Sequence, residues 1–406
     1  MSVVSQSEAL EGRPDSVTRL GLLAYGLDRP ASGIGRFTIE LAQALARFPD
    51  ELAIMLLTPF SGSPAGLDRL YPSVRLRGRL LPSLMSAGPP QIAAIARRAG
   101  LRVVHDPFGV SPFLVPHRIA PFARVVTIHD MVPFIYPETH ARLTNWLFRH
   151  YIPRTLRFVD QVVTVSEASR RDIQRYYGMP ASKIRVIPNG VSPAFTPVPP
   201  TAVAGVLRRY AVPQSYILTV GALQARKNLE TLFAAYRVLR CKGLPHRLVV
   251  TGRKAWKAAG IFTSLQQLGL EEDVILTGYV ADEDLPALYS GAAAFAFPSL
   301  YEGFGLPPLE AMACGTPVVT SNRSSLPEVV GTAGLTVEPS DVRGFASALE
   351  RLLTDAALHE ACRERGLARA SRFTWDAAAA EYLDLYRSLA ARRKDVGSAL
   401  PVTTAR

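Results

Sequence analysis

The sequence has few of the features that mark secreted, metal-bound or membrane-spanning proteins. Its 406 residues include three cysteines, which stand far apart at Cys241, Cys314 and Cys362. An odd, scattered set fits a reducing compartment and provides neither a disulfide framework nor a zinc site. The first 17 residues include two glutamates and lack the apolar core of a signal peptide, and no apolar run approaches a membrane span of roughly 18 residues. We therefore expect a cytoplasmic protein whose contact with any membrane is peripheral.

Motifs of several other functional classes are also missing. The chain has no Walker A sequence and no G-x-S-x-G sequence, which disfavours phosphoryl transfer and serine hydrolysis. Its 46 Lys and Arg against 34 Asp and Glu give a net charge of +12, which suggests a nucleotide, a nucleic acid or an acidic lipid as partner. The arginines are dispersed, and no helix-turn-helix, zinc-finger or aromatic RNA-binding signature is present, so nucleic acid is disfavoured.

What the chain does contain is a regular alternation of apolar runs with amphipathic segments of helical period. Continuous apolar strands are typical of a parallel sheet that helices cover on both faces. The predicted strands are residues 19–26, 52–58, 101–106, 123–130, 161–166 and 184–190, then 216–222, 246–252, 273–280, 292–299, 316–321 and 334–339. The pattern predicts an α/β protein with two consecutive doubly wound, Rossmann-like domains.

A proline-rich stretch separates the two series of strands. Four prolines between residues 193 and 200 can continue neither a helix nor a central strand, so we predict a linker there. The predicted organisation is a first domain over 1–192, a second domain over 201–375, a helix over 376–394 that packs back on the first domain, and a tail over 395–406. Two such domains face each other across a cleft at the carboxyl ends of their strands, where α/β folds bind ligands.

The segment over 297–321 is the richest in candidate functional residues. Glu302 precedes a turn with Gly303 and Gly305, and Glu310 follows in the helix that begins there. Carboxylates accept hydrogen bonds from sugar or ribose hydroxyls, and a helix N-terminus attracts phosphate. Acidic residues near a helix start are also common without any function.

The whole string from Glu302 to Val319 resembles the E-x7-E signature of the family 4 glycosyltransferases, retaining enzymes with the two-domain GT-B fold. Within that family the chain is most similar to the bacterial polysaccharide mannosyltransferases. The resemblance implies that Glu302 contacts the transferred sugar and Glu310 the nucleotide ribose. It also implies that the turn from Gly303 through Phe304 and Gly305 to Leu306 approaches the sugar and diphosphate.

A second candidate segment follows the strand that ends at Gly221. Arg226 and Lys227 stand in the loop before a helix, where two cations and free amides suit a diphosphate. An Arg-Lys pair is usually a solvated surface pair, but the resemblance implies that these two bind phosphate. Many family members have arginine directly after the glycine, where this chain has Ala222, so Arg226 is expected to replace that contact.

The resemblance assigns the remaining candidates to three groups. Gly33 and Gly35, between the first strand and the first helix, would approach the donor phosphates, and His129 would reach the donor sugar from the first domain, although a lone histidine is more often structural. The loops around the nucleotide base would supply Gly252, Arg253, Gly278, Tyr279 and Val280. The acceptor candidates are Arg36, His105 and Asp130.

No metal and no cofactor is expected. Asp282 and Asp284 form a D-x-D pattern that binds metal in another glycosyltransferase fold, but they directly precede a helical segment. We therefore predict that one of them caps that helix. No histidine pair at a spacing of four and no Cys-x-x-Cys occurs.

The function expected from these observations is metal-independent, retaining transfer of a hexose from a nucleoside diphosphate to a saccharide or lipid-linked glycan. GDP-mannose is the first donor expected, dTDP-rhamnose the second and a UDP-hexose the third. A nucleotide-sugar epimerase or a synthase of the same fold is the alternative. The segment 140–158 combines four arginines with Trp146 and other apolar residues, which suggests docking on an anionic membrane, unless those aromatic residues belong to the core.

Overall fold

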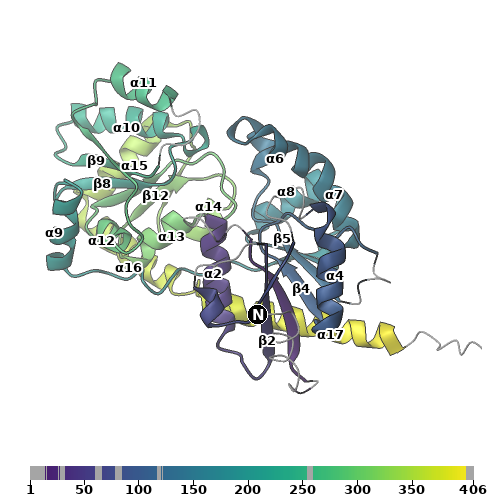
Figure 1. The fold of residues 1–406 in the computed structure, drawn as a ribbon. Helices are drawn as coiled ribbons and strands as arrows, with labels where there is room; N and C mark the ends of the chain where they lie inside the picture. The colour runs from purple at the N-terminus through teal and green to yellow at the C-terminus, as the bar shows by residue number, and fades with distance from the viewer. Residues whose placement is uncertain are drawn as a thin grey trace, which may run out of the picture.

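Two parallel sheets form the centres of two lobes (Figure 1). The computed structural model describes residues 14, 16–25, 27, 33–59, 66–77, 85–116, 120, 122–253 and 259–398. The first sheet has the order β3-β2-β1-β4-β5-β6-β7 and the second the order β10-β9-β8-β11-β12-β13. Each order reverses once, between β1 and β4 and between β8 and β11, and such reversals are where doubly wound sheets bind ligands.

All twelve predicted strands are present. The first sheet contains β1 (Thr18–Leu23), β2 (Leu52–Thr58), β3 (Ser73–Arg75), β4 (Val103–Asp106), β5 (Ala123–Thr127), β6 (Gln161–Thr164) and β7 (Ile184–Val186). The second contains β8 (Tyr216–Val220), β9 (Arg247–Thr251), β10 (Val274–Gly278), β11 (Ala294–Phe297), β12 (Val318–Ser321) and β13 (Leu335–Val337). The sequence missed β3, because only one of its three residues, Val74, is apolar.

Helices cover both sheets, as their amphipathic patterns predict. In the first lobe they are α2 (Gly33–Leu45), α4 (Gly88–Arg98), α5 (Val132–Ile135), α6 (Arg142–Trp146), α7 (Ile152–Thr155) and α8 (Glu167–Tyr177). In the second they are α9 (Pro200–Arg209), α10 (Leu229–Cys241), α11 (Ala259–Gln267), α12 (Leu285–Ser290), α13 (Leu306–Ala313), α14 (Leu326–Val330), α15 (Val342–Thr354) and α16 (Ala356–Ala370). None of the described helices combines the length and apolarity that a membrane crossing requires.

The last helix, α17 (Trp375–Ser398), leaves the second lobe and runs along the first (Figure 1). It packs on α2 and against β1, β4 and β5. Two buried tyrosines anchor it, because Tyr382 bonds to Thr127 and Tyr386 bonds to His105. The helix extends four residues beyond the predicted end at Lys394, and residues 399–406 of the predicted tail lie outside the described part of the chain.

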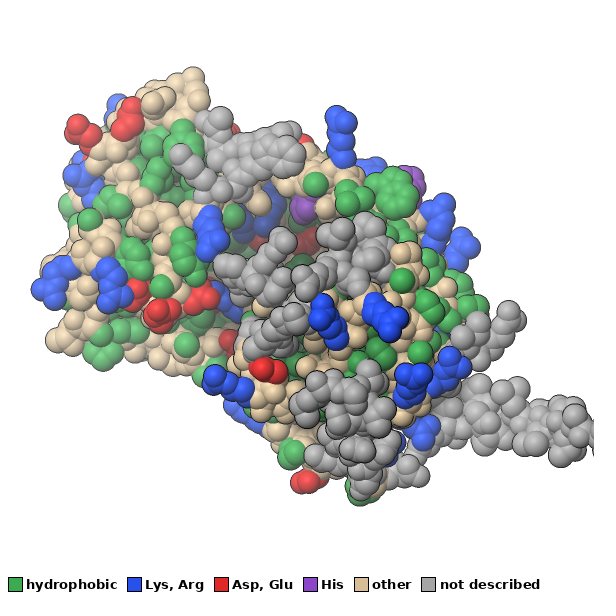
Figure 2. All heavy atoms as spheres, in the orientation of Figure 1, with side chains coloured by type: hydrophobic (Ala, Val, Ile, Leu, Met, Phe, Trp, Pro, Cys, Tyr) green, Lys and Arg blue, Asp and Glu red, His purple; other side chains and the backbone are tan. Residues whose placement is uncertain are grey.

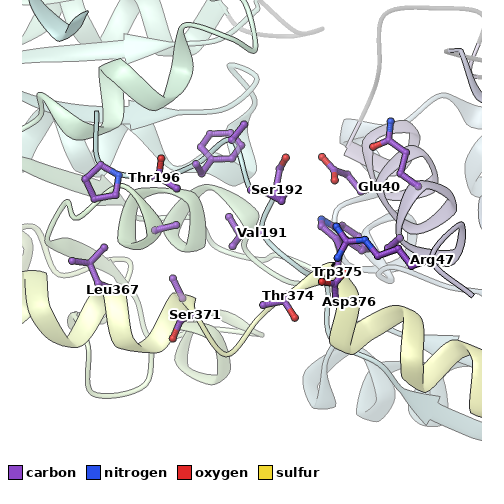
Figure 3. A pocket seen from close by; sticks show the side chains of 18 residues that line it. Glu40, Arg47, Val191, Ser192, Thr196, Leu367, Ser371, Thr374, Trp375 and Asp376 are labelled. Carbon is purple, nitrogen blue, oxygen red and sulfur yellow. Dashed lines mark hydrogen bonds and ion pairs between the residues drawn. The ribbon is translucent and has the colours of Figure 1, made fainter. Parts of the chain in front are cut away.

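The chain crosses between the lobes at two adjacent segments. Val191, at the start of the proline-rich stretch, forms a parallel bridge with Thr374, just before α17. The stretch is packed rather than loose: Phe195 is buried against Tyr289 with ring centres 5.9 Å apart, and α9 already begins at Pro200. A cavity of about 620 Å³ lies beside these crossings, lined by α2, the proline-rich stretch and the start of α17 (Figure 3). None of the predicted site residues lines it.

Candidate active site

The two richest sequence segments meet where the second sheet reverses its order. Arg226 and Lys227 lie in a short helix, η6 (Ala225–Lys227), between β8 and α10, and Glu302 follows β11. Because β8 and β11 are neighbours in the sheet, both loops leave the same edge side by side. Figure 2 shows a hollow between the lobes with basic and acidic side chains inside it.

Glu302 accepts hydrogen bonds from both cations through one oxygen. Its Oε1 lies 2.9 Å from Arg226 Nη1, 2.5 Å from Lys227 Nζ and 2.6 Å from Ser299 Oγ. Burial alone would raise the pKa of Glu302, but the charges of Arg226 and Lys227 outweigh it and lower that pKa to about 2. Burial lowers the pKa of Lys227 to about 8, against the attraction of Glu302. The site therefore holds an ionised carboxylate between two cations.

Serines that the sequence analysis did not identify hold the turn after Glu302. Ser324 Oγ accepts a hydrogen bond of 2.8 Å from the Glu302 backbone N–H. Ser325 Oγ donates to the carbonyls of Glu302 and Phe304, at 3.0 and 2.5 Å. Both follow β12, the neighbour of β11, in the run Ser321-Asn-Arg-Ser-Ser. A polar run directly after a buried strand was the signal that could have identified them.

The turn at Gly303 is where the two domains touch beside the site. A Cβ on Gly303 would lie 2.4 Å from the His129 carbonyl oxygen, so only glycine permits this approach. Ser166 Oγ donates to the Gly303 carbonyl at 2.7 Å, and Ser169 Oγ donates to the His129 carbonyl at 3.0 Å. The first domain thus presents the end of its strand β5 directly to the glycine turn of the second.

His129 is buried in surroundings that favour a neutral imidazole. Its Nε2 donates to the Pro107 carbonyl at 2.8 Å, and its ring packs edge-on against Phe37, with ring centres 4.6 Å apart. Burial lowers the pKa of His129, which favours the neutral form. The neighbouring Asp130 accepts a hydrogen bond of 3.0 Å from the Val132 backbone N–H through Oδ1.

Glu310 is buried in α13 and has a partner on each oxygen. Tyr289 donates to Oε2 at 2.9 Å, and Arg36 of the first domain donates to Oε1 at 3.1 Å. The other terminal nitrogen of Arg36 donates to Asp282 at 2.6 Å. Arg36 was predicted on the acceptor side, and the structure instead pairs it with two carboxylates of the second domain. The reason is its place in the first turn of α2, opposite α13.

Most loops assigned to the nucleotide lie at the same edge of the second sheet. A Cβ on Gly252 would lie 1.9 Å from the Gly221 carbonyl oxygen, so the ends of β8 and β9 converge. The guanidinium carbon of Arg253 lies 4.3 Å from the centre of the exposed Tyr279 ring. Tyr279 stands between Gly278, at the end of β10, and the buried Val280. Leu306 begins α13. Gly33 and Gly35 do not precede the first helix as predicted, because α2 already begins at Gly33.

Two sequence predictions are wrong. His105 cannot contact an acceptor, because it is completely buried between Thr127 and Tyr386, each 2.8 Å from a ring nitrogen. Asp284 stands at the N-cap position of α12 but makes no capping bond. Its carboxylate accepts instead from Arg209 and Tyr210, while Asp282 pairs with Arg36. Across the described residues, no group of three His, Cys, Asp or Glu side chains is placed to hold a metal ion.

Family comparisons agree with this geometry on both domains. Residues 31–195 match the model described as Glycosyltransferase Family 4, and residues 210–369 match Glycosyl transferases group 1. The chain is 33% identical to the O-antigen chain mannosyltransferase B of Escherichia coli over 89% of its own length and 97% of that protein. It is 30% identical to the serotype-specific mannosyltransferase WbdA of Escherichia coli over 72% of its own length and 37% of that protein.

A comparison of folds gives the same architecture. The structure of Anabaena Alr3699/HepE in complex with UDP and glucose superposes with a TM-score of 0.70 at 19% identity, covering 95% of this chain and 100% of that one. The two doubly wound domains, the positions of Glu302 in the loop after β11 and Glu310 in α13, and the relationship to the mannosyltransferase B sequence all agree. The chain therefore belongs to glycosyltransferase family 4, has the GT-B fold and is a glycosyltransferase.

Proposed function

We propose that this glycosyltransferase moves mannose from GDP-mannose to a hydroxyl of a saccharide or lipid-linked glycan in bacterial polysaccharide synthesis, with retention of configuration and without a metal ion. The observation that carries the proposal is the cluster of Arg226, Lys227 and Glu302 where the second sheet reverses its order. The mannose assignment is supported by the relationship to the O-antigen mannosyltransferase B. The alternatives are dTDP-rhamnose or a UDP-hexose as donor, and an epimerase or synthase of this fold.

The cluster suits departure of a diphosphate. Breaking the bond between sugar and phosphate places negative charge on the leaving oxygen, and preorganised cations stabilise that charge most effectively in a site shielded from water. Arg226 and Lys227 are both largely buried and are held in place by Glu302. They would supply the charge that a divalent cation supplies in other transferases, which is the basis for proposing metal independence.

Retention is proposed from membership in glycosyltransferase family 4, and the state of Glu302 bears on how it would be achieved. A carboxylate that two cations hold ionised, with its pKa lowered to about 2, is a weak nucleophile toward the sugar. We therefore favour attack of the acceptor on the face that the diphosphate leaves, with the departing phosphate oxygen taking the acceptor's proton. Among the described residues, every hydrogen bond to the Glu302 carboxylate reaches Oε1, so Oε2 is placed to accept from a sugar hydroxyl. His129 would approach the same sugar from the first domain.

The donor's other parts would bind along the second sheet. Glu310 would hold the ribose, and the glycine turn from Gly303 to Leu306 would approach the diphosphate with its amides. The exposed pair of Arg253 and Tyr279 would border the base. Asp130, at the end of β5 in the first domain, would face the acceptor.

The proposal places the enzyme in the cytoplasm, at the inner face of the membrane, where lipid-linked acceptors lie. In α6 the side chains of Leu143 and Trp146 are 55% and 53% exposed, while Leu147 and Ile152 are buried in the domain core. The exposed basic residues around them are Arg142, Arg149, Arg154 and Arg157. Residues 140–158 contain no acidic side chain. Figure 2 shows hydrophobic and basic side chains together over the region of α6 and α7. Apolar side chains within a basic field suit an anionic lipid surface.

A product assay tests the function. The protein is incubated with GDP-mannose, dTDP-rhamnose, UDP-glucose or UDP-galactose and a mannosylated lipid-linked acceptor, with and without EDTA. We expect mannose transfer that EDTA leaves intact, and an α-linked product by NMR from the α-linked donor. Transfer from a UDP-sugar alone would overturn the donor assignment. A β-linked product would overturn retention, and loss of activity in EDTA with rescue by manganese would overturn metal independence.

A further inference from the structure

Arg36 bridges the two domains at the carboxylate that is proposed to bind the ribose. It projects from α2 of the first domain and holds Glu310 Oε1 with Nη1 and Asp282 Oδ1 with Nη2. The two bridges differ in exposure, because the side chain of Glu310 is 6% exposed and that of Asp282 is 52% exposed. One arginine therefore connects a buried carboxylate of the site with a solvated one at its rim.

The approach to Glu310 passes Arg36. Tyr289, on Oε2, is completely buried and packs against the rings of Phe195 and Phe295, so no ligand enters from that side. The side chain of Arg36 is 27% exposed, which makes its side the solvent-facing one. A ribose presents two neighbouring hydroxyls, and because Oε2 is enclosed and bonded to Tyr289, the oxygen of Glu310 that they can reach is Oε1. The guanidinium and the ribose would then require the same oxygen, Oε1.

We propose that Arg36 is an interdomain latch that competes with the donor's ribose for Glu310. The proposal rests on the proposed role of Glu310 as the ribose ligand. Asp282 gives the latch a second position: an Arg36 displaced from Glu310 keeps its bridge of 2.6 Å to Asp282 and is not left as an unpaired cation. Donor binding and domain contact are linked through one side chain, so each weakens the other by the same factor.

A second contact between the domains provides a matched control. Glu328 accepts hydrogen bonds from the first two amides of α8, Glu167 N at 2.8 Å and Ala168 N at 2.7 Å. It crosses the same interface as Arg36 and touches none of the residues assigned to the donor. Removing its charge loosens the domains without freeing Glu310, so Glu328→Gln separates loss of domain contact from loss of competition.

The test compares two nucleotides on three proteins. GDP and 2′,3′-dideoxy-GDP differ only in the two ribose hydroxyls, and their dissociation constants are measured by calorimetry for wild type, Arg36→Met and Glu328→Gln. Glu310→Gln is measured in the same way as a check of the proposed ribose contact. Lys227 has a pKa of about 8, so all titrations are run at one pH below that value, where this cation keeps its charge. Burial raises the pKa of Glu310 and the charge of Arg36 opposes this rise, so the titrations are repeated at a second pH to detect protonation of Glu310. Where GDP does not bind, UDP and its dideoxy analogue replace the pair.

Relative to wild type, we expect Arg36→Met to strengthen binding of GDP about fivefold more than it changes binding of dideoxy-GDP, whose shift should be no larger than the one Glu328→Gln produces. Glu328→Gln should shift both nucleotides equally. An equal effect of Arg36→Met on both nucleotides, or weaker binding of GDP, would overturn the latch. If wild type prefers GDP over dideoxy-GDP by the same factor as Glu310→Gln does, Glu310 does not bind the ribose. That result would contradict the proposed site itself. Failure of wild type and Arg36→Met to bind any of these nucleotides would overturn both.

Discussion

Lys227 Nζ lies 2.5 Å from Glu302 Oε1, and this contact joins the loop after β8 to the loop after β11. The ammonium group also lies 4.6 Å from the centre of the Phe297 ring. Lys227 is thus buried among an anion, an aromatic face and the second cation, Arg226. An ammonium group in such surroundings is costly for the fold unless an anion compensates it, and the donor's diphosphate would provide further compensation.

Removing Lys227 should abolish most transfer without unfolding the protein. We expect Lys227→Ala to lower kcat by about 10²–10³-fold, the usual effect of removing one preorganised group that stabilises developing charge. The matched control is Lys242→Ala, which removes a lysine paired with Glu350 on the surface. Initial rates on the identified donor measure the effect. Near-normal turnover of Lys227→Ala, with the control equally active, would contradict the site assignment.

The same lysine should make kcat/KM fall at alkaline pH. Burial lowers the pKa of Lys227 to about 8, so its positive charge is present below that pH and is lost as pH rises through it. We expect kcat/KM to fall above pH 8 in the wild type, because this parameter reports groups of the free enzyme. Lys227→Arg keeps its charge throughout the range and should lack the decline, whatever its absolute rate. Identical profiles of the two proteins would assign the decline to another group.

Ionised Glu302 should stabilise the fold at neutral pH, and this contribution should be lost in acid. Its pKa is lowered from 4.5 to about 2, so its contribution is complete above pH 4.5 and is lost as pH falls from there toward 2. That shift corresponds to about 3 kcal/mol at neutral pH. We expect Glu302→Gln to have a lower thermal midpoint than wild type at pH 7 and the gap to narrow between pH 4.5 and 3.5.

The control for this prediction is Glu350→Gln, whose partner Lys242 is solvated. A surface pair contributes less than about 1 kcal/mol, so its midpoint should stay close to wild type at every pH. A gap between wild type and Glu302→Gln that stays constant down to pH 3.5 would mean that Glu302 does not titrate as its contacts imply.

The basic and apolar face of α6 should bind vesicles through both kinds of side chain. We expect sedimentation with liposomes to rise with acidic lipid content and to fall with salt. We expect two double variants to weaken vesicle binding about tenfold each. One combines Leu143→Ser with Trp146→Ser, and the other combines Arg142→Ala with Arg157→Ala. Leu70→Ser, another exposed leucine of the first lobe, should have no effect. Equal binding to neutral and acidic vesicles, or none, would leave the basic face without this role.

The sequence by itself determined every strand except β3, the two glutamates and the Arg-Lys loop. Buried parallel strands are continuous apolar runs. Glu302 and the Arg-Lys pair stand in loops that follow such strands, and Glu310 stands in the helix that comes next. In a parallel sheet all strands point the same way, so the loops that follow them leave the sheet at one edge. The local pattern missed β3, which has a single apolar residue, and it predicted that Asp282 or Asp284 caps α12, although neither does.

Only the tertiary structure decided which distant side chains became partners. Arg36 and Glu310 are 274 residues apart, and Tyr386 and His105 are 281 apart, so their contacts depend on how two domains and a returning helix pack. The serines after β12 and at the start of α8 acquire their roles in the same way. The local sequence around an arginine in a first helical turn does not reveal its partner. The ion pair depends on which side chains of the opposite domain come within a few ångströms of it.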